Sequence, residues 1–239
     1  MIEFATIKDK KELLSLWQMT FLEDSSVIEH FFESIFESVV TPVIRLEGEI
    51  ASSLFLLPCK IGEYNGLCVY CAMTKYAHRG KGYMRKLLDF SYDYCKENNF
   101  DFLFLVPAEE SLFDYYRTCG FENFGVSRIY TIDNTIPQKT ELLKIDFELD
   151  FDDSVVKYWE NSCITYDGEV TDFGLCFPDD ETFIRNAKGN YEDVPEKHRK
   201  SGTVIKGNIT FGEEYSPAMI KTENEKIKNI TCYIGVTLE

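Results

Sequence analysis

The stretch Thr74–Met84, with the sequence T-K-Y-A-H-R-G-K-G-Y-M, determines how the rest of this chain is interpreted. An apolar run at Leu67–Met73 precedes it and predicts a buried strand, and an amphipathic segment that predicts a helix follows it. Basic side chains are frequent from Lys75 to Lys86 and acidic ones are absent, although the whole chain has a formal net charge of −16. A glycine turn at the start of a helix presents free N–H groups at the positive end of the helix dipole. The segment therefore predicts a site for a ligand that carries a polyphosphate group.

The spacing of the glycines distinguishes between kinds of phosphate-binding turn. A nucleotide P-loop needs G-x-x-x-x-G-K-[ST], and Gly80-Lys81-Gly82 has neither that spacing nor the hydroxyl residue. A dinucleotide-binding fingerprint needs G-x-G-x-x-G directly after a strand, whereas Arg85 occupies the position of the third glycine here. The pattern that fits is R-x-x-G-x-G/A, which begins at Arg79 and ends at Met84.

This motif and its surroundings resemble the GCN5-related N-acetyltransferases, the GNAT family. In that family the turn holds the pyrophosphate of acetyl-coenzyme A, and the preceding strand pairs its backbone with the pantetheine arm. The resemblance implies main-chain contacts to the pantetheine from Ala72, Met73 and Thr74. It implies pyrophosphate contacts from Arg79, Gly80, Lys81, Gly82, Tyr83, Met84 and Arg85. Acetyl-CoA is therefore the expected co-substrate.

A second family signature, usually written Y-x-x-x-G-F, is present from Tyr116 to Phe121. A short apolar run at Phe102–Val106 predicts a buried strand before it, and Ser111–Cys119 predicts a helix with Gly120 as a C-cap. The resemblance implies that Tyr116 is the general acid that protonates the departing coenzyme A sulfur. Packing is the ordinary alternative for any single tyrosine. The sequence does not indicate which residue is the general base. Deprotonation of the amine through water, without a side-chain base, is an alternative.

The resemblance extends over residues 1 to about 132 and is only architectural beyond them. Met84 stands where most members have Gly or Ala, and a bulky aliphatic there is similar to the Eis-like branch, whose members join two GNAT-type regions. We therefore expect a catalytic domain at residues 1–132, a linker at 133–140 and a smaller α+β domain at 141–239. A partial second GNAT-like unit is one interpretation of that smaller domain.

The apolar periodicity predicts the element order β-α-α-β-β-β-α-β-α-β, which is that of the GNAT fold. The expected class is α/β (α+β), with a central mixed, mostly antiparallel sheet flanked by helices. The other strands are expected at Ile2–Ile7, Pro42–Leu46 and Ile50–Ile61, and the helices at 9–21, after Ser25 or Ser26, and at 83–97. The inner side of the first helix is expected to carry Leu13, Leu14, Trp17 and Phe21.

The second region predicts a mixture of helices and strands. Helices are expected near Asp152–Ser162 and Asp179–Ala187, with a polar loop at Asn186–Ser201. Strands are expected near Thr203–Phe211, Ala218–Lys221 and Lys226–Leu238.

Composition excludes several classes of protein. A sequence pI of about 4.7 argues against a nucleic-acid-binding surface, and no apolar run is long enough to predict a membrane span or a secretion signal. Eight scattered cysteines are typical of a reduced, cytoplasmic protein. Cys68 and Cys71 are spaced like half of a metal or redox site, but an offset of three on a strand sends two side chains to opposite faces. No metal is therefore expected.

Together these features predict an N-acetyltransferase that moves an acetyl group from acetyl-CoA to a primary amine of a small molecule or a peptide. The alternative is a non-catalytic GNAT-fold module that binds an acyl-CoA as a sensor or scaffold. Retention of Tyr116 beside an intact turn favours the enzyme. The sequence predicts neither the acceptor nor the oligomeric state.

Overall fold

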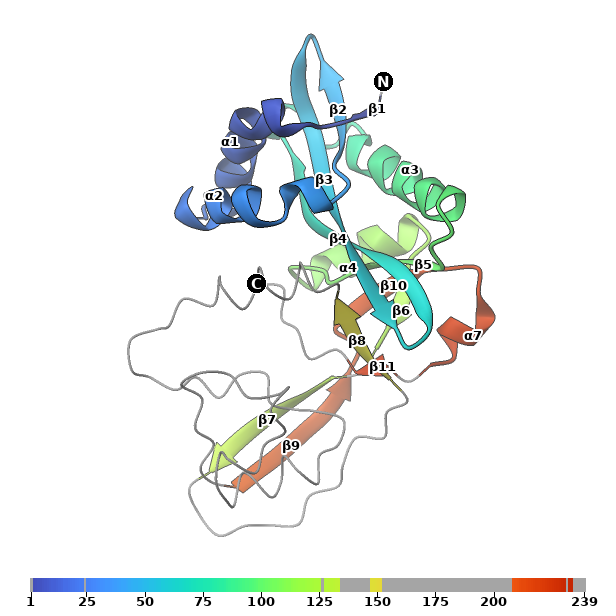
Figure 1. The fold of residues 1–239 in the computed structure, drawn as a ribbon. Coiled ribbons are helices and arrows are strands. Elements are labelled where there is room, and N and C mark those ends of the chain that lie inside the picture. The colour runs from blue at the N-terminus through green and yellow to red at the C-terminus, as the bar shows by residue number, and fades with distance from the viewer. Residues whose placement is uncertain are drawn as a thin grey trace.

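The computed structural model describes residues 2–23, 25–125, 127–133, 147–151, 208–230 and 232–233 (Figure 1). The strands are β1 (Ile2–Phe4), β2 (Pro42–Leu46), β3 (Glu49–Ile61), β4 (Tyr64–Thr74), β5 (Phe102–Leu105), β6 (Glu122–Phe124), β7 (Ser127–Asp133), β8 (Phe147–Phe151), β9 (Asn208–Tyr215), β10 (Ala218–Lys221) and β11 (Cys232–Tyr233). The α-helices are α1 (Lys10–Phe21), α2 (Ser25–Ser34), α3 (Tyr83–Glu97), α4 (Ser111–Thr118) and α7 (Glu225–Lys228), and short 3-10 helices occur at Ile7–Asp9, Phe36–Ser38 and Tyr76–His78. Among these helices none is long and apolar enough to cross a membrane.

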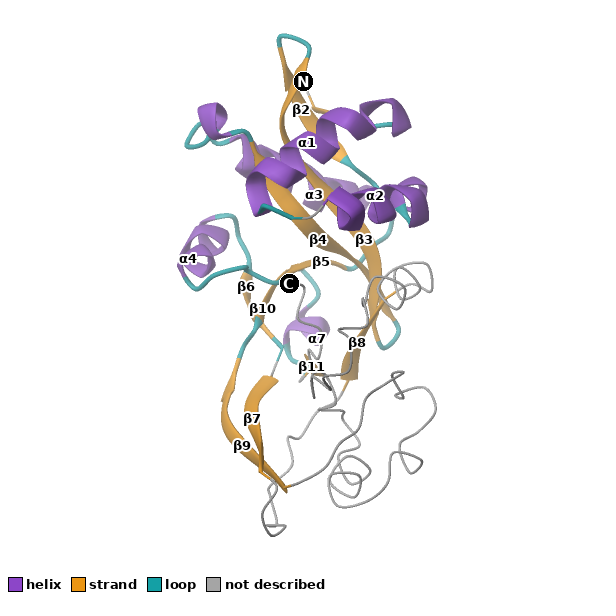
Figure 2. Ribbon diagram, turned by 90° about the vertical axis from the view of Figure 1, so that its left-hand side faces the viewer, coloured by secondary structure: helices purple, strands orange, loops and turns teal. Residues whose placement is uncertain are grey.

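The main sheet has the strand order β1-β2-β3-β4-β5-β10-β6. Every neighbouring pair along this path is antiparallel except β4 and β5, which run parallel. Helices α1 and α2 cover one face and α3 and α4 the other (Figures 1 and 2), and each face has its own cluster of buried apolar side chains. This arrangement confirms the predicted GNAT-like architecture.

Aromatic rings fill the space between the sheet and the first two helices. The Phe31 ring lies 5.0 Å from that of Trp17 and 4.7 Å from that of Phe55 on β3. Helix α1 turns Leu13, Leu16 and Trp17 inward, at the i, i+3, i+4 spacing of one helix face. The prediction that Phe21 lies on this side was wrong: its side chain is 42% exposed, because the helix ends there with Leu22 in the left-handed region (φ 56°).

Strand β4 has one residue more than β3 between two of their shared pairs. Ser53 pairs with Met73 and Phe55 with Tyr70, so Cys71 and Ala72 together face a single residue of β3. This β-bulge is accompanied by a positive φ of 46° at Cys71, a conformation that costs energy for a residue with a Cβ. The bulge breaks the alternation of side chains along the strand.

The bulge also corrects the prediction about the two cysteines. Cys68 is part of the buried cluster on the α1/α2 side, and Cys71 packs against the same cluster. The two thiols therefore lie on one side of the sheet, whereas a regular strand would have sent them to opposite faces.

The sheet is completed by a strand from far along the chain. β10 pairs antiparallel with β5 on one edge and with β6 on the other, and Met219 in its middle is fully buried. Ala218–Lys221 was predicted as a strand of the smaller C-terminal domain, but it forms part of the main sheet. β8 adds to the end of β3 and pairs with β11, while β7 and β9 form a separate two-stranded ribbon.

Several predicted boundaries shift. The first strand stops at Phe4 because the Asp9 carboxylate accepts from the Thr6 N–H and begins a 3-10 turn. The strand predicted at Lys226–Leu238 was wrong at its start, where Asn224 caps helix α7. The strand expected near Thr203–Phe211 is β9, which ends later. The two helices expected within 152–187, the loop at 186–201 and most of the linker at 133–140 lie outside the described residues.

The position of β10 predicts that replacing a methionine by alanine will destabilise the protein at Met219 but not at Met19. Met219→Ala should destabilise the protein by ~2–5 kcal/mol, because it leaves a cavity in the apolar cluster between the sheet and helices α3 and α4. Met19→Ala is the control, since that side chain is 61% exposed on α1 and its loss should change stability by ~0.5 kcal/mol or less. Urea unfolding of both variants measures the difference. Equal stability would show that β10 is not part of the core.

Candidate active site

Strand β4 separates from β5 shortly before the bulge. Their parallel pairing comprises Gly66 with Phe102, Leu67 with Leu103 and Cys68 with Phe104. From residue 69 to residue 74, β4 keeps β3 on one side and, in the described part of the chain, has no paired strand on the other. Backbone N–H and C=O groups on that side are available to an extended ligand, as at any exposed strand edge.

The glycine turn follows directly at the end of this open edge. Gly80 and Gly82 have φ values of 72° and 77°, in the left-handed region that favours glycine. A Cβ built on either would meet no atom within 4 Å, so the space beside both glycines is open. Gly82 is the N-cap of α3, and the first helical bond runs from the Lys86 N–H to its carbonyl. The N–H groups of residues 83–85 thus have no partner inside the helix and point out of its N-terminus.

The cations of the turn are exposed and lack acidic partners within the described residues. Arg79 donates from Nε to the Thr74 carbonyl at 3.2 Å, and Lys81 Nζ lies 3.5 Å from His78 Nδ1. Lys86 lies over the Tyr83 ring at 5.7 Å. The first turn of α3 contains no acidic residue. The turn therefore combines free backbone donors with positive charge that no described carboxylate neutralises.

The side chains of the last predicted turn residues point elsewhere. Tyr83 and Met84 are half-buried and pack against the cluster beneath α3. The Arg85 guanidinium donates to the Thr118 carbonyl at the C-terminal end of α4. Their backbone N–H groups, rather than their side chains, face the space beyond the helix N-terminus.

The second signature is a helix-stop motif. Helix α4 ends at Thr118, Gly120 follows in the left-handed region (φ 85°), and its N–H donates to the Arg117 carbonyl at 3.0 Å. The Phe121 N–H donates to the Tyr116 carbonyl at 3.1 Å, and the rings of these two residues lie 5.9 Å apart. Both bonds and the apolar contact define a Schellman motif, which explains the spacing of tyrosine, glycine and phenylalanine.

Tyr116 belongs to the apolar cluster that also contains Val69 on β4 and Leu105 on β5. Its side chain is 8% exposed, and burial raises the pKa of its hydroxyl to about 12. The phenol is therefore protonated throughout the neutral range. Burial likewise raises the pKa of Tyr115, whose ring lies 5.4 Å from that of Tyr116.

Lys221 on β10 is a residue of this region that the sequence patterns did not indicate. Its Nζ donates to the Cys119 carbonyl at 2.9 Å and to Asp89 Oδ1 at 3.2 Å, and lies 4.9 Å from the centre of the Tyr92 ring. Two cations, Arg85 and Lys221, thus bind successive carbonyls at the negative end of α4. A Cβ on Gly120 would come within 3.3 Å of the Lys221 side chain, a second reason for glycine there.

Residues 1–124 match the family model described as "Acetyltransferase (GNAT) domain", which covers more than half of the 239 residues. The chain belongs to the GNAT acetyltransferase family. Comparison with curated protein sequences gave no match. The similarity to the Eis-like branch remains a prediction.

Solved structures with related folds include a conserved protein of unknown function from Enterococcus faecalis V583, described as a probable N-acyltransferase. The TM-score is 0.52 at 14% identity, over 61% of this chain and 38% of that one, so this chain spans well under half of that protein. Glucosamine-6-phosphate N-acetyltransferase from Arabidopsis thaliana is similar at a TM-score of 0.44 and 21% identity, over 52% of this chain and 92% of that one. A family member from Escherichia coli in complex with CoA has a TM-score of 0.44 at 16% identity, over 52% and 68% of the two chains.

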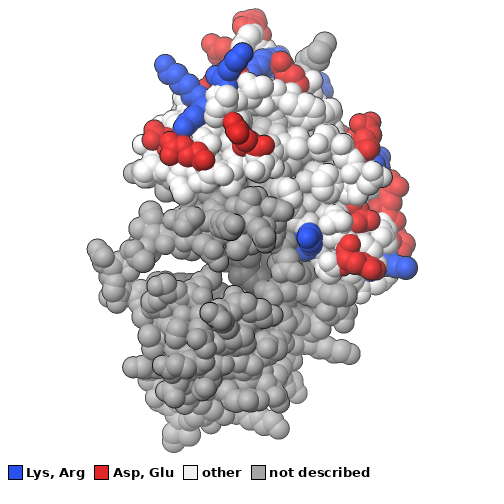
Figure 3. All heavy atoms as spheres, viewed as in Figure 1, with Lys and Arg blue, Asp and Glu red and all other residues white. Residues whose placement is uncertain are grey.

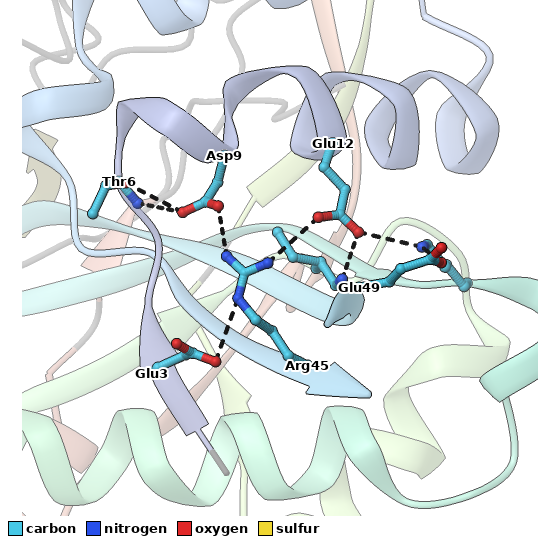
Figure 4. A network of polar contacts seen from close by, with 8 residues as sticks. Glu3, Thr6, Asp9, Glu12, Arg45 and Glu49 are labelled. Carbon is cyan, nitrogen blue, oxygen red and sulfur yellow. Dashed lines mark hydrogen bonds and ion pairs between the residues drawn. The ribbon is translucent and has the colours of Figure 1, made fainter. Parts of the chain in front are cut away.

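A polar network fixes the end of β4 in this GNAT domain. Arg45 contacts Glu3 at 3.3 Å, Asp9 at 2.6 Å and Glu12 at 3.4 Å (Figure 4). Glu12 Oε1 also accepts from the Ile50 N–H at 2.5 Å and from Lys75 Nζ at 3.4 Å. The network ties α1 and the β2–β3 hairpin to the residue that follows β4.

The same network accounts for part of the surface charge. Lys75 makes a second ion pair, with Glu49 at 2.9 Å. Figure 3 shows acidic and basic side chains side by side over the hairpin at the top of the molecule. Of the cations near the turn, Lys75 is therefore held in ion pairs with carboxylates, whereas the described residues offer no such partner to Arg79 or Lys81.

Lys221→Met tests the link between β10 and α4. The substitution keeps an unbranched side chain but leaves the Cys119 carbonyl and Asp89 without their donor, so we expect a loss of ~1–3 kcal/mol in the free energy of unfolding. Lys226→Met, at an exposed lysine of α7, is the control and should have little effect. Equal urea midpoints for the two variants would contradict a role for Lys221 in holding α4.

Proposed function

We propose that this protein transfers the acetyl group of acetyl-CoA to a primary amine of a small molecule or a peptide. The observation that carries the proposal is the continuity of the open β4 edge with the cationic glycine turn. An elongated ligand with hydrogen-bonding amides at one end and a pyrophosphate at the other matches both parts at once. Among the described residues, the buried thiols of Cys68, Cys95 and Cys119 form no disulfide, which suits a reducing compartment and is in keeping with a cytoplasmic enzyme.

The chain's own residues fit acetyl-CoA in two segments. Ala72, Met73 and Thr74 would offer backbone groups to the pantetheine arm along the unpaired side of β4. Gly80 to Arg85 would offer N–H groups and the side chains of Arg79 and Lys81 to the pyrophosphate. The two segments follow one another along the chain, so one ligand can span both.

The reaction joins the amine nitrogen to the thioester carbonyl carbon and breaks the carbon–sulfur bond. A backbone N–H at the end of β4 would stabilise the negative charge that develops on the carbonyl oxygen. Tyr116 would give its proton to the departing thiolate, and its raised pKa keeps that proton available at neutral pH. The amine loses its proton to water or to a base that the described residues do not identify, and Tyr116 is reprotonated before the next turnover.

Binding should depend on the turn. Arg79→Ala should weaken acetyl-CoA binding by about tenfold or more through loss of a charge-assisted hydrogen bond. Gly82→Val should weaken it further, because a side chain strains the left-handed backbone and occupies the space for the pyrophosphate. Gly48→Val is the matched control, since Gly48 has a φ of 89° and an equally open surrounding in the β2–β3 turn. The measurement is calorimetric titration with acetyl-CoA. The pyrophosphate assignment fails if Gly48→Val and Gly82→Val bind alike.

Tyr116→Phe should lower kcat by ~10²–10⁴-fold while acetyl-CoA affinity is nearly unchanged, because the hydroxyl acts on the departing thiolate. Tyr115→Phe, the neighbouring tyrosine on α4, is the control and should retain kcat. Because the Tyr116 pKa is about 12, kcat of the unmodified enzyme should not fall through the moderately alkaline range by loss of this proton. Steady-state kinetics with a panel of amines measures both effects. Full kcat in Tyr116→Phe would remove the acid role, and binding without any turnover would favour the non-catalytic module.

A further inference from the structure

Ser52 on β3 is a fully buried hydroxyl residue beside the end of β4. Its Oγ donates to the Met73 carbonyl at 2.9 Å and shares a second hydrogen bond of 2.8 Å with Thr74 Oγ1. Ser52, Leu54 and Leu56 are every second residue of β3 and so share one face of the strand. The two leucines pack in the cluster under α3. An apolar side chain would suit that cluster, so the hydroxyl has a reason other than packing.

The register of the ladder fixes where the Thr74 N–H points. Ser52 and Thr74 lie opposite each other, and the next bond runs from the Lys75 N–H to the Ala51 carbonyl at 2.9 Å. Ser52 and Thr74 are therefore a non-hydrogen-bonded pair of the antiparallel ladder, in which each residue's own N–H and C=O face away from the partner strand. The Thr74 N–H consequently points to the side of β4 that β5 has left.

Other contacts occupy the remaining polar groups around this N–H. The Thr74 carbonyl accepts from Arg79 Nε at 3.2 Å, and the Thr74 hydroxyl is bonded to Ser52. The Met73 carbonyl belongs to the same planar peptide unit as the Thr74 N–H, so a bond that holds one end of the unit orients the other. This matters here because the bulge at Cys71, with its positive φ, lies immediately before the unit.

We propose that Ser52 is a positioning residue for the acyl transfer: it locks the Met73–Thr74 peptide so that the Thr74 N–H is presented to the carbonyl oxygen of the thioester. This inference rests on the proposed function. Ser52 touches neither substrate nor the reacting atoms. Its effect is to fix the direction of a donor whose hydrogen bond strengthens as the carbonyl oxygen gains negative charge, which favours the transition state over the bound substrate.

The test compares two adjacent serines on one strand. Ser53 is also fully buried, and its hydroxyl also bonds a backbone carbonyl, that of Pro42 at 3.4 Å, but it lies on the opposite face of β3, toward β2. Ser52→Ala should lower kcat roughly tenfold with the affinity for free CoA, which lacks the thioester carbonyl, unchanged. Ser53→Ala should alter neither quantity, and Ser52→Thr, which keeps the hydroxyl, should restore most of kcat.

A second readout does not depend on turnover. In nitrogen-15 spectra of the unmodified protein, the Thr74 amide resonance should move further on addition of acetyl-CoA than on addition of CoA. In Ser52→Ala this difference should shrink.

The outcomes separate the two proposals. Turnover by the unmodified protein with full kcat in Ser52→Ala would overturn the positioning role alone. Equal losses in Ser52→Ala and Ser53→Ala, or a parallel loss of CoA affinity, would also overturn it, because they indicate general destabilisation. Failure of the unmodified protein to acetylate any amine would overturn the proposed function and this inference together.

Discussion

Two parallel strands, β4 and β5, exchange hydrogen bonds over three residue pairs and then separate, and the other features of the site follow from that separation. A bulge at Cys71 and Ala72 bends β4, and its positive φ at Cys71 is held in place by the long antiparallel pairing with β3. Beyond residue 68, β4 is paired with β3 on one side and has no described partner strand on the other. Contacts from outside the strand therefore hold its end in place. Glu12 does this from α1 by accepting from Lys75, the residue that follows β4, and Ser52 does it from β3 by donating to the Met73 carbonyl.

The helix that carries Tyr116 is fixed in a comparable way. Its C-terminus is closed by the Schellman motif around Gly120, and the last carbonyls accept from Arg85 and Lys221. Arg85 belongs to the first turn of the helix that begins at the glycine turn. The end of α4 and the proposed phosphate site are therefore joined through one side chain, so a displacement of either would be felt by the other.

Much of the fold could be predicted because its signals are local. The glycine turn, the period of α3 and the apolar run of β5 each depend on residues that are close in the sequence, and the structure has these elements where they were expected. The bulge could not be predicted, because no residue type marks it: Cys71 adopts a left-handed φ without being Gly or Asn. Its consequence, two cysteines on one side of a strand, was therefore predicted wrongly.

Contacts between residues that are far apart in the sequence could not be predicted either. Lys221 lies far from Asp89 and Cys119 in the chain, and only the insertion of β10 brings them together. Likewise the contact between Ser52 and Thr74 depends on the register of β3 and β4, which the bulge sets. The residues predicted for the turn were accessible to sequence reasoning because a single short motif contains them all, whereas the supports of that motif come from other strands.

The insertion of β10 also has a consequence for the order in which the molecule assembles. β5 and β6 leave the ribosome long before β10 does, at ~5–20 residues per second, and until then the edges that will pair with β10 have no partner strand. Two exposed strand edges are templates for pairing with other chains. The pairing of β10 with β5 and β6 joins segments that are far apart in the sequence. It must overcome the entropy of closing a long loop, which slows folding. The nascent chain therefore passes through a period in which β5, whose four residues are all buried in the finished sheet, has an open edge.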